Sequence, residues 1–159
     1  MGEQPLRQSA FYGKGGIGKS TTSQNIAAAL GEAGLKMLVV VCDPKADCTS
    51  LLTGELFQET VLEKVRSQSR NAAPNAPVEG IVHTGFADTA CVESGGPEPG
   101  GGCAGRGIIS AIERIGRQGI IHEGPASGFY DVHGEGVCGA SAIPSRARTA
   151  PTSYLGRSG

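Results

Sequence analysis

The feature that most constrains this chain is the glycine-rich run GKGGIGKS at residues 13–20. Its spacing is that of a loop that wraps backbone N–H groups around the phosphates of a nucleotide. In such a loop the lysine neutralises phosphate charge, and the serine hydroxyl ligates magnesium. The run therefore predicts an MgATP site, with Ser20 as the magnesium ligand. The predicted nucleotide-binding residues are Gly13, Lys14, Gly15, Gly16, Ile17, Gly18, Lys19, Ser20 and Thr21.

The segments around this loop predict the strand before it and the helix after it that a phosphate-binding loop requires. Residues 7–12 (RQSAFY) predict a short strand before the loop, and residues 20–33 predict a helix after it, which ends at Gly34. The apolar run KMLVVVC at residues 36–42 suits a parallel strand that is covered on both faces. Together these segments form a right-handed βαβ unit. The expected fold class is therefore α/β, of the P-loop NTPase type, with a mostly parallel sheet and flanking helices.

Later elements carry weaker signals. Residues 55–66 predict a helix, residues 67–80 a polar surface loop, and most of residues 91–107 are too rich in glycine and proline for regular structure. FYDV at 129–132 predicts the end of a strand, although residues 118–128 lack the apolar character of a central strand. A further helix close behind Cys103 is predicted from isoleucines at helical spacing: Ile108, Ile109, Ile112 and Ile115.

The composition limits the kind of partner. A chain of 159 residues suits one domain with a real core, and a formal net charge of −1 argues against nucleic-acid and membrane-surface partners. No apolar stretch approaches about 20 residues, and the start lacks a signal-peptide pattern, so we expect a soluble, cytoplasmic protein. The five cysteines are an odd number, which favours reduced thiols available for metal or redox chemistry.

Several charged residues are candidates for chemistry at the phosphates. Asp43 and Asp47 follow a predicted strand, where they either hold magnesium waters and orient the attacking water or form a solvated turn. Asp131 opens the sequence DVHG and is either a γ-phosphate sensor or part of a simple strand-end turn. Lys14 is either a solvated loop charge or part of a KGGxGKS motif. That motif resembles dimeric, nucleotide-switched P-loop ATPases, in which this lysine reaches the partner's nucleotide.

Two cysteines lie in glycine-rich stretches, Cys103 in GGGCAGRG and Cys138 in GEGVCGAS. The chain has no Cys-x-x-Cys pair, which argues against a mononuclear zinc site. Small neighbours let an inorganic cluster approach a thiolate. A four-iron cluster usually needs four thiolates, so two per chain would serve only where two chains meet. From spacing alone, structurally inert thiols are the better interpretation.

Taken together, these motifs are similar to those of the nitrogenase iron protein family, the dinitrogenase reductases. The block from CVESGGPEPG to GCAGRG is its most specific part, because related reductases of bacteriochlorophyll and chlorophyll synthesis usually differ there. The resemblance rests on six segments in the family order: YGKGGIGKSTT at 12–22, CDPKAD at 42–47, CVESGGPEPG at 91–100, GCAGRG at 102–107, FYDV at 129–132 and VCG at 137–139.

The resemblance implies a homodimer with one bridging [4Fe-4S] cluster and one MgATP per subunit. It implies an enzyme, the reductase component of nitrogenase, with coupled ATP hydrolysis. Electrons would come from a low-potential ferredoxin or flavodoxin and pass to the catalytic nitrogenase component. The alternatives are a related reductase component of tetrapyrrole synthesis, or a nucleotide-binding and cluster-carrying remnant without turnover. By position, the resemblance assigns Cys103 and Cys138 as cluster ligands, Arg106 as an ADP-ribosylation site, and Lys14, Asp43, Asp47, Asp131 and Glu135 as catalytic residues.

The sequence also departs from the family. Family chains are close to twice as long, so the C-terminal half of the family fold is expected to be missing. Residues 1–144 would then be the N-terminal part of a single P-loop ATPase domain, and residues 145–159 a divergent tail weakly resembling the next family strand. Glu135 stands where the family has an aspartate implicated in hydrolysis, and its longer side chain is expected to lower the rate. Cys48 stands where the family has serine.

Overall fold

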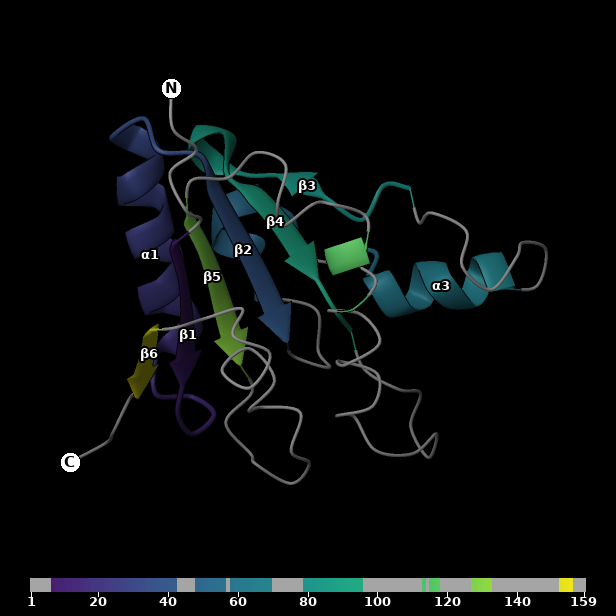
Figure 1. Ribbon diagram of the computed structural model, residues 1–159, viewed down its shortest axis with the longest axis horizontal. Helices are drawn as coiled ribbons and strands as arrows, with labels where there is room; N and C mark the ends of the chain where they lie inside the picture. The colour runs from purple at the N-terminus through teal and green to yellow at the C-terminus, as the bar shows by residue number, and fades with distance from the viewer. Residues whose placement is uncertain are drawn as a thin grey trace.

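The described part of the chain has an α/β fold, with one sheet and helices packed around it. In the computed structural model, the described residues are 7–42, 48–56, 58–69, 79–95, 113, 115–117, 127–132 and 152–155. The strands run in the order β3-β4-β2-β5-β1-β6, and among them only the β3–β4 pair is antiparallel (Figure 1). The strands are β1 (Arg7–Tyr12), β2 (Met37–Cys42), β3 (His83–Thr84), β4 (Ala90–Glu93), β5 (Ser127–Val132) and β6 (Thr152–Leu155). The helices are α1 (Lys19–Glu32), α2 (Ser50–Thr53), α3 (Val61–Ser69) and the 3-10 helix η1 (Phe86–Asp88).

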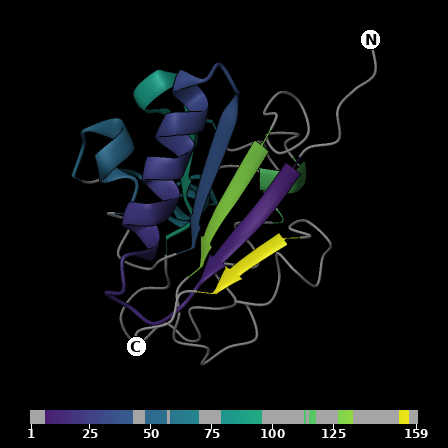
Figure 2. The same ribbon diagram turned by 90° about the vertical axis from the view of Figure 1, so that its left-hand side faces the viewer.

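The predicted unit of strand, glycine loop, helix and strand is confirmed. β1 ends at Tyr12, α1 begins at Lys19, and Gly34 follows the end of the helix. β1 and β2 are parallel to one another without being neighbours, because β5 lies between them and pairs with both (Figure 2). The expected α/β class with a mostly parallel sheet is therefore correct.

Strand β2 forms the middle of the core. Each of its six residues is buried, as expected for a parallel strand covered on both faces. Alternate side chains enter two different clusters. On one face Met37, Val39 and Val41 pack with Ala27 of α1, Phe11, Leu52, Cys91 and Phe129. On the other face Leu38, Val40 and Cys42 pack with Val61 and Leu62 of α3, Ala10, Ile81, Val92, Ile115 and Tyr130.

The helix predicted over residues 55–66 was wrong at its start. α3 begins at Val61 because Thr60 caps it: the Glu63 N–H donates to Thr60 Oγ1 at 3.2 Å, and the Thr60 N–H donates to Glu63 Oε2 at 2.9 Å. Leu56 lies before this cap and is 74% exposed. A separate short helix, α2, comes earlier and ends before Gly54. The predicted surface loop over 67–80 likewise begins late, since α3 continues to Ser69.

Residues 91–93, at the start of the stretch predicted to be mostly irregular, belong to β4 and pair with β2. One prediction about a strand needs correction. Residues 129–132 end a central strand, not a marginal one. A β-carbon at Gly128 would lie 3.7 Å from Gln8 Cγ, so a neighbouring side chain already fills the space that glycine leaves. Backbone pairing on both sides then holds the strand in place.

The remaining predicted elements are described only in part. Residues 113 and 115–117 are helical, and Ile115 is fully buried, while Ile108, Ile109 and Ile112 lie outside the described residues. Within the tail, residues 152–155 form β6 beside β1. Among the described helices, none is long and apolar enough to cross a membrane.

Candidate nucleotide-binding site

The glycine loop starts directly after β1 and leads into α1, at the carboxyl end of a central parallel strand. Gly16 and Gly18 have φ angles of +80° and +88°, a left-handed conformation that residues with a β-carbon rarely adopt. A β-carbon built at Gly15, Gly16 or Gly18 would meet no heavy atom within 4 Å. The loop thus turns through left-handed glycines, and the space beside them is open. These residues fit the phosphates of a nucleotide.

The lysine of the motif lies over the loop. Lys19 is the first residue of α1, and its Nζ donates a hydrogen bond to the Lys14 carbonyl oxygen at 3.1 Å. Its ammonium group therefore folds back over residues 14–19, where phosphate charge would be neutralised. The first turn of α1 contains no acidic residue. Nothing in that turn opposes the partial positive charge that a helix carries at its N-terminus.

Two buried carboxylates lie along the same end of the sheet. Phe11, Asp131, Val41 and Glu93 pair in one row across β1, β5, β2 and β4. Phe11 and Val41 pack on the face that α1 covers, and residues in one row share a face, so Asp131 and Glu93 point to that face as well. They are 3% and 1% exposed, and about 10 Å separates strands two places apart.

Asp131 lies beside the strand that leads into the loop. It lies within β5, one residue before its end, with β1 on one side and β2 on the other. Glu93 was missed by the sequence analysis. The available signal was an acidic residue at the end of an apolar strand, the same signal that singled out Asp131.

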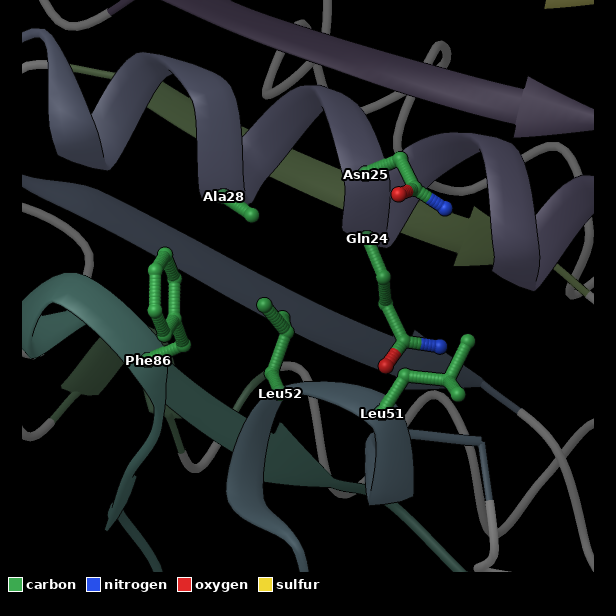
Figure 3. Close-up of a pocket in the computed structure, with 6 residues that line it drawn as sticks. All are labelled: Gln24, Asn25, Ala28, Leu51, Leu52 and Phe86. Atoms are coloured by element: carbon green, nitrogen blue, oxygen red, sulfur yellow. The ribbon is translucent and has the colours of Figure 1, made fainter.

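Gln24 is a second buried polar residue that the sequence analysis missed. It lies on α1, one turn after Ser20, and is 3% exposed. Its Nε2 donates to the Ser20 carbonyl at 3.1 Å and also to the Cys48 carbonyl. Gln24 also lines a pocket of about 210 Å³ between α1, α2 and η1, together with Asn25, Ala28, Leu51, Leu52 and Phe86 (Figure 3).

The cysteines among the described residues do not form a metal centre. Cys42 and Cys91 are buried in clusters on opposite faces of the sheet. Burial, together with the Glu93 carboxylate, raises the pKa of the Cys91 thiol to about 12, so this thiol keeps its proton. No group of three metal-ligating side chains occurs in the part of the chain that the structure describes.

The structure thus brings the loop residues 13–21 and Asp131 to one edge of the sheet. The other predicted site residues lie outside the described residues: Asp43, Asp47, Cys103, Arg106, Glu135 and Cys138.

Similar folds occur in a tyrosine kinase domain, a septum site-determining protein and a ParA family ATPase. The structure is similar to the kinase domain of Escherichia coli tyrosine kinase ETK, with a TM-score of 0.64, 16% identity, and coverage of 98% of this chain and 56% of that chain. It is similar to the septum site-determining protein MinD from Pyrococcus horikoshii OT3, solved in complex with Mg-ADP. Here the TM-score is 0.64 and the identity 20%, over 94% of this chain and 57% of that chain. A ParA family ATPase from Chlorobium tepidum TLS has a TM-score of 0.59 and 15% identity, over 94% of this chain and 59% of that chain.

At these identities the likeness concerns the fold alone, which is the fold of MinD and ParA proteins. The chain spans somewhat more than half the length of each of these structures. The sequence itself carries a more specific match, which extends from the first residue of β1 to the last residue of the chain. Residues 7–159 match the model of the 4Fe-4S iron sulfur cluster binding proteins, NifH/frxC family, and the chain therefore belongs to that family.

Proposed function

We propose that this chain binds MgATP at residues 13–21 and is the ATP-dependent reductase component of a nitrogenase. The observation that carries the proposal is the loop itself: left-handed glycines, open space beside them, and the Lys19 ammonium held over the loop at the start of α1. Membership of the NifH/frxC family supports the iron–sulfur reductase role. The MinD structure of the same fold contains Mg-ADP, which supports the choice of nucleotide.

In this proposal each residue has a physical task. Backbone N–H groups of the loop bind the phosphates, and the Lys19 ammonium exchanges the Lys14 carbonyl for a phosphate oxygen. The Ser20 hydroxyl ligates magnesium. Asp131, beside the strand that leads into the loop, would act as the γ-phosphate sensor. Further catalytic roles are proposed for residues outside the described part: Asp43 and Asp47 at the magnesium waters, and Glu135 at the attacking water.

The proposed active species is a homodimer, in which Lys14 reaches the nucleotide of the partner subunit. Cys103 and Cys138 from both chains would hold one [4Fe-4S] cluster, which supplies a one-electron carrier when bound. The proposed donor is a low-potential ferredoxin or flavodoxin, and the proposed acceptor is the catalytic nitrogenase component. Arg106 is proposed as the site of ADP-ribosylation. A role in tetrapyrrole reduction is the alternative, which the CVESGGPEPG sequence disfavours.

Nucleotide binding is tested by titrating the chain with a fluorescent MgADP analogue. Lys19→Gln should weaken binding by about tenfold or more, because a charged hydrogen bond contributes about 1.5–3 kcal/mol. Lys36→Gln is a matched control. Lys36 is exposed and precedes the amino end of β2, whereas the loop lies at the carboxyl end of the sheet. Equal affinity of the two variants would rule out this loop as the nucleotide site.

Cluster binding is tested by anaerobic reconstitution with iron and sulfide, followed by iron counting and electron paramagnetic resonance. We expect about four irons per two chains. Cys103→Ala and Cys138→Ala should each abolish the signal, whereas Cys48→Ala should keep it. Electron transfer is then assayed with the catalytic component of nitrogenase and, separately, of a tetrapyrrole reductase. Transfer to the second alone would favour the alternative, and a loaded protein inactive with both would be a carrier without turnover.

A further inference from the structure

One backbone peptide unit is held from both sides by buried side chains. This unit joins Cys48 to Thr49, directly after the acidic segment and before α2. Its carbonyl oxygen accepts a hydrogen bond from Gln24 Nε2, and its N–H donates to Glu93 Oε1 at 2.7 Å. Gln24, Thr49 and Glu93 are 3%, 1% and 1% exposed, so water does not compete for these hydrogen bonds.

The same Gln24 amide reaches the phosphate loop. Its Nε2 also donates to the carbonyl oxygen of Ser20 at 3.1 Å. Both neighbours of this nitrogen are carbonyl oxygens, which only accept hydrogen bonds, so the orientation of the amide is fixed. Figure 3 shows the Gln24 side chain extending from α1 towards α2. A continuous series of contacts therefore runs from Ser20 through Gln24 and the 48–49 peptide to Glu93.

The far end of the series is tied into the sheet. Glu93 is the last residue of β4, and the next residue, Ser94, makes two backbone hydrogen bonds. Its N–H donates to the Val41 carbonyl at 2.9 Å, and its carbonyl accepts from the Leu62 N–H at 3.2 Å. The backbone that follows Glu93 is therefore held in place, so a movement of the Glu93 carboxylate would also move the end of β4.

We propose that Gln24 and Glu93 are positioning residues that hold the 48–49 peptide between the phosphate loop and the carboxyl end of β4. Through it, a nucleotide at the loop and the backbone at the end of β4 stabilise one another. The nucleotide part rests on the proposed function, in which Ser20 ligates magnesium. Such coupling works in both directions, because each site changes the free energy of the other by the same amount. Because these groups are buried, water does not replace their hydrogen bonds, which favours a stiff connection.

The test is amide hydrogen exchange, measured by NMR on the full chain with and without MgADP. Gln24→Glu removes the donor, and Glu93→Leu removes the acceptor. Glu93→Gln keeps an acceptor oxygen for the Thr49 N–H and should restore the behaviour. Tyr130→Phe is the matched control, because it removes another buried hydrogen bond, from Tyr130 Oη to Gln8 Oε1 at 3.2 Å, which belongs to the opposite face of the sheet.

In the unmodified protein, MgADP should slow exchange of the amides at residues 91–94 by about fivefold or more. The slowing should persist in Tyr130→Phe and Glu93→Gln and be lost in Gln24→Glu and Glu93→Leu. Equal slowing in every variant would overturn the proposal. Should Gln24→Glu not fold, Gln24→Met removes the same donor with an apolar side chain of similar length.

Failure of the proposed function gives a different result. If MgADP does not change the exchange rates of the loop amides in the unmodified protein, the proposed nucleotide site is wrong. The connection is then tested by exchange rates measured without nucleotide. Gln24→Glu should then still speed exchange of the Thr49 amide by about fivefold, because the peptide loses one of its two anchors. An unchanged Thr49 rate would overturn the connection itself.

Discussion

The conformation of Gly18 predicts opposite effects for two alanine substitutions in the same loop. Gly18 has a φ of +88°, and Gly15 does not have a positive φ, yet a β-carbon at either position meets no atom within 4 Å. Gly18→Ala therefore introduces strain without a clash, at a cost of about 1–2 kcal/mol. Gly15→Ala is expected to stabilise the fold by about 0.4–1 kcal/mol, because it restricts only the unfolded chain.

These free energies convert to a measurable difference in melting temperature. For a chain of this size 1 kcal/mol corresponds to about 2–4 °C. Gly18→Ala should melt about 2–8 °C lower than the unmodified protein, and Gly15→Ala about 1–4 °C higher. Circular dichroism melts, checked by urea unfolding, measure both without nucleotide. Should Gly18→Ala melt at or above the unmodified temperature, the left-handed backbone would not be the reason for glycine at this position.

Three further predictions concern the core and its edges. Burial and Glu93 raise the pKa of Cys91 from 9.0 to about 12, so the folded protein keeps a proton that the unfolded chain loses. The free energy of unfolding should therefore fall as the pH rises from 9 to about 12, by up to about 1.4 kcal/mol per pH unit. The fall should be less steep in Cys91→Ala. Equal slopes of the two proteins, measured by urea unfolding across this pH range, would contradict the prediction. Thr60→Ala removes the cap of α3 and should lower the free energy of unfolding by about 1 kcal/mol, with faster amide exchange in α3; unchanged exchange there would count against the cap. Gly85→Ala places a β-carbon 3.0–3.1 Å from the side chain and backbone of Leu52, which should cost about 1–3 kcal/mol. Urea unfolding measures this loss, and a free energy of unfolding equal to that of the unmodified protein would contradict the clash.

Residues 7–42 could be predicted because their signals are local. The glycine spacing fixes the loop, Gly34 ends the helix, and the run 36–42 is apolar throughout. The start of α3 was missed although its signal is also local. Thr60 and Glu63 have the spacing of a capping box, and the apolar residue Leu56 drew the predicted helix past it.

The central position of β5 could not be read from its own residues. Ser127 and Gly128 are poor strand formers, and they are held by pairing with Arg7, Gln8, Met37 and Leu38, which are about 90–120 residues away in sequence. Gln24 and Glu93 pose the same difficulty. Gln24 also binds the nearby Ser20 carbonyl, and Glu93 follows an apolar strand, but the peptide that both residues hold lies 24 and 44 residues away from them. Neighbouring residues therefore do not show that Gln24 and Glu93 share a partner. The sequence therefore indicates which residue types could act at a site. Which of these residues lie together depends on pairing between segments far apart in the sequence.

The position of β5 between β1 and β2 also affects the order in which the chain is synthesised and folds. β1 and β2 leave the ribosome first, but each waits for a hydrogen-bonding partner that is encoded about 85 residues after Cys42. At 5–20 residues per second, the delay is about 4–17 s. During that interval the apolar strand MLVVVC has an unpaired edge, which is the kind of segment that aggregates or recruits a chaperone. The yield of folded protein should therefore depend on how quickly residues 127–132 follow, since their arrival closes the centre of the sheet.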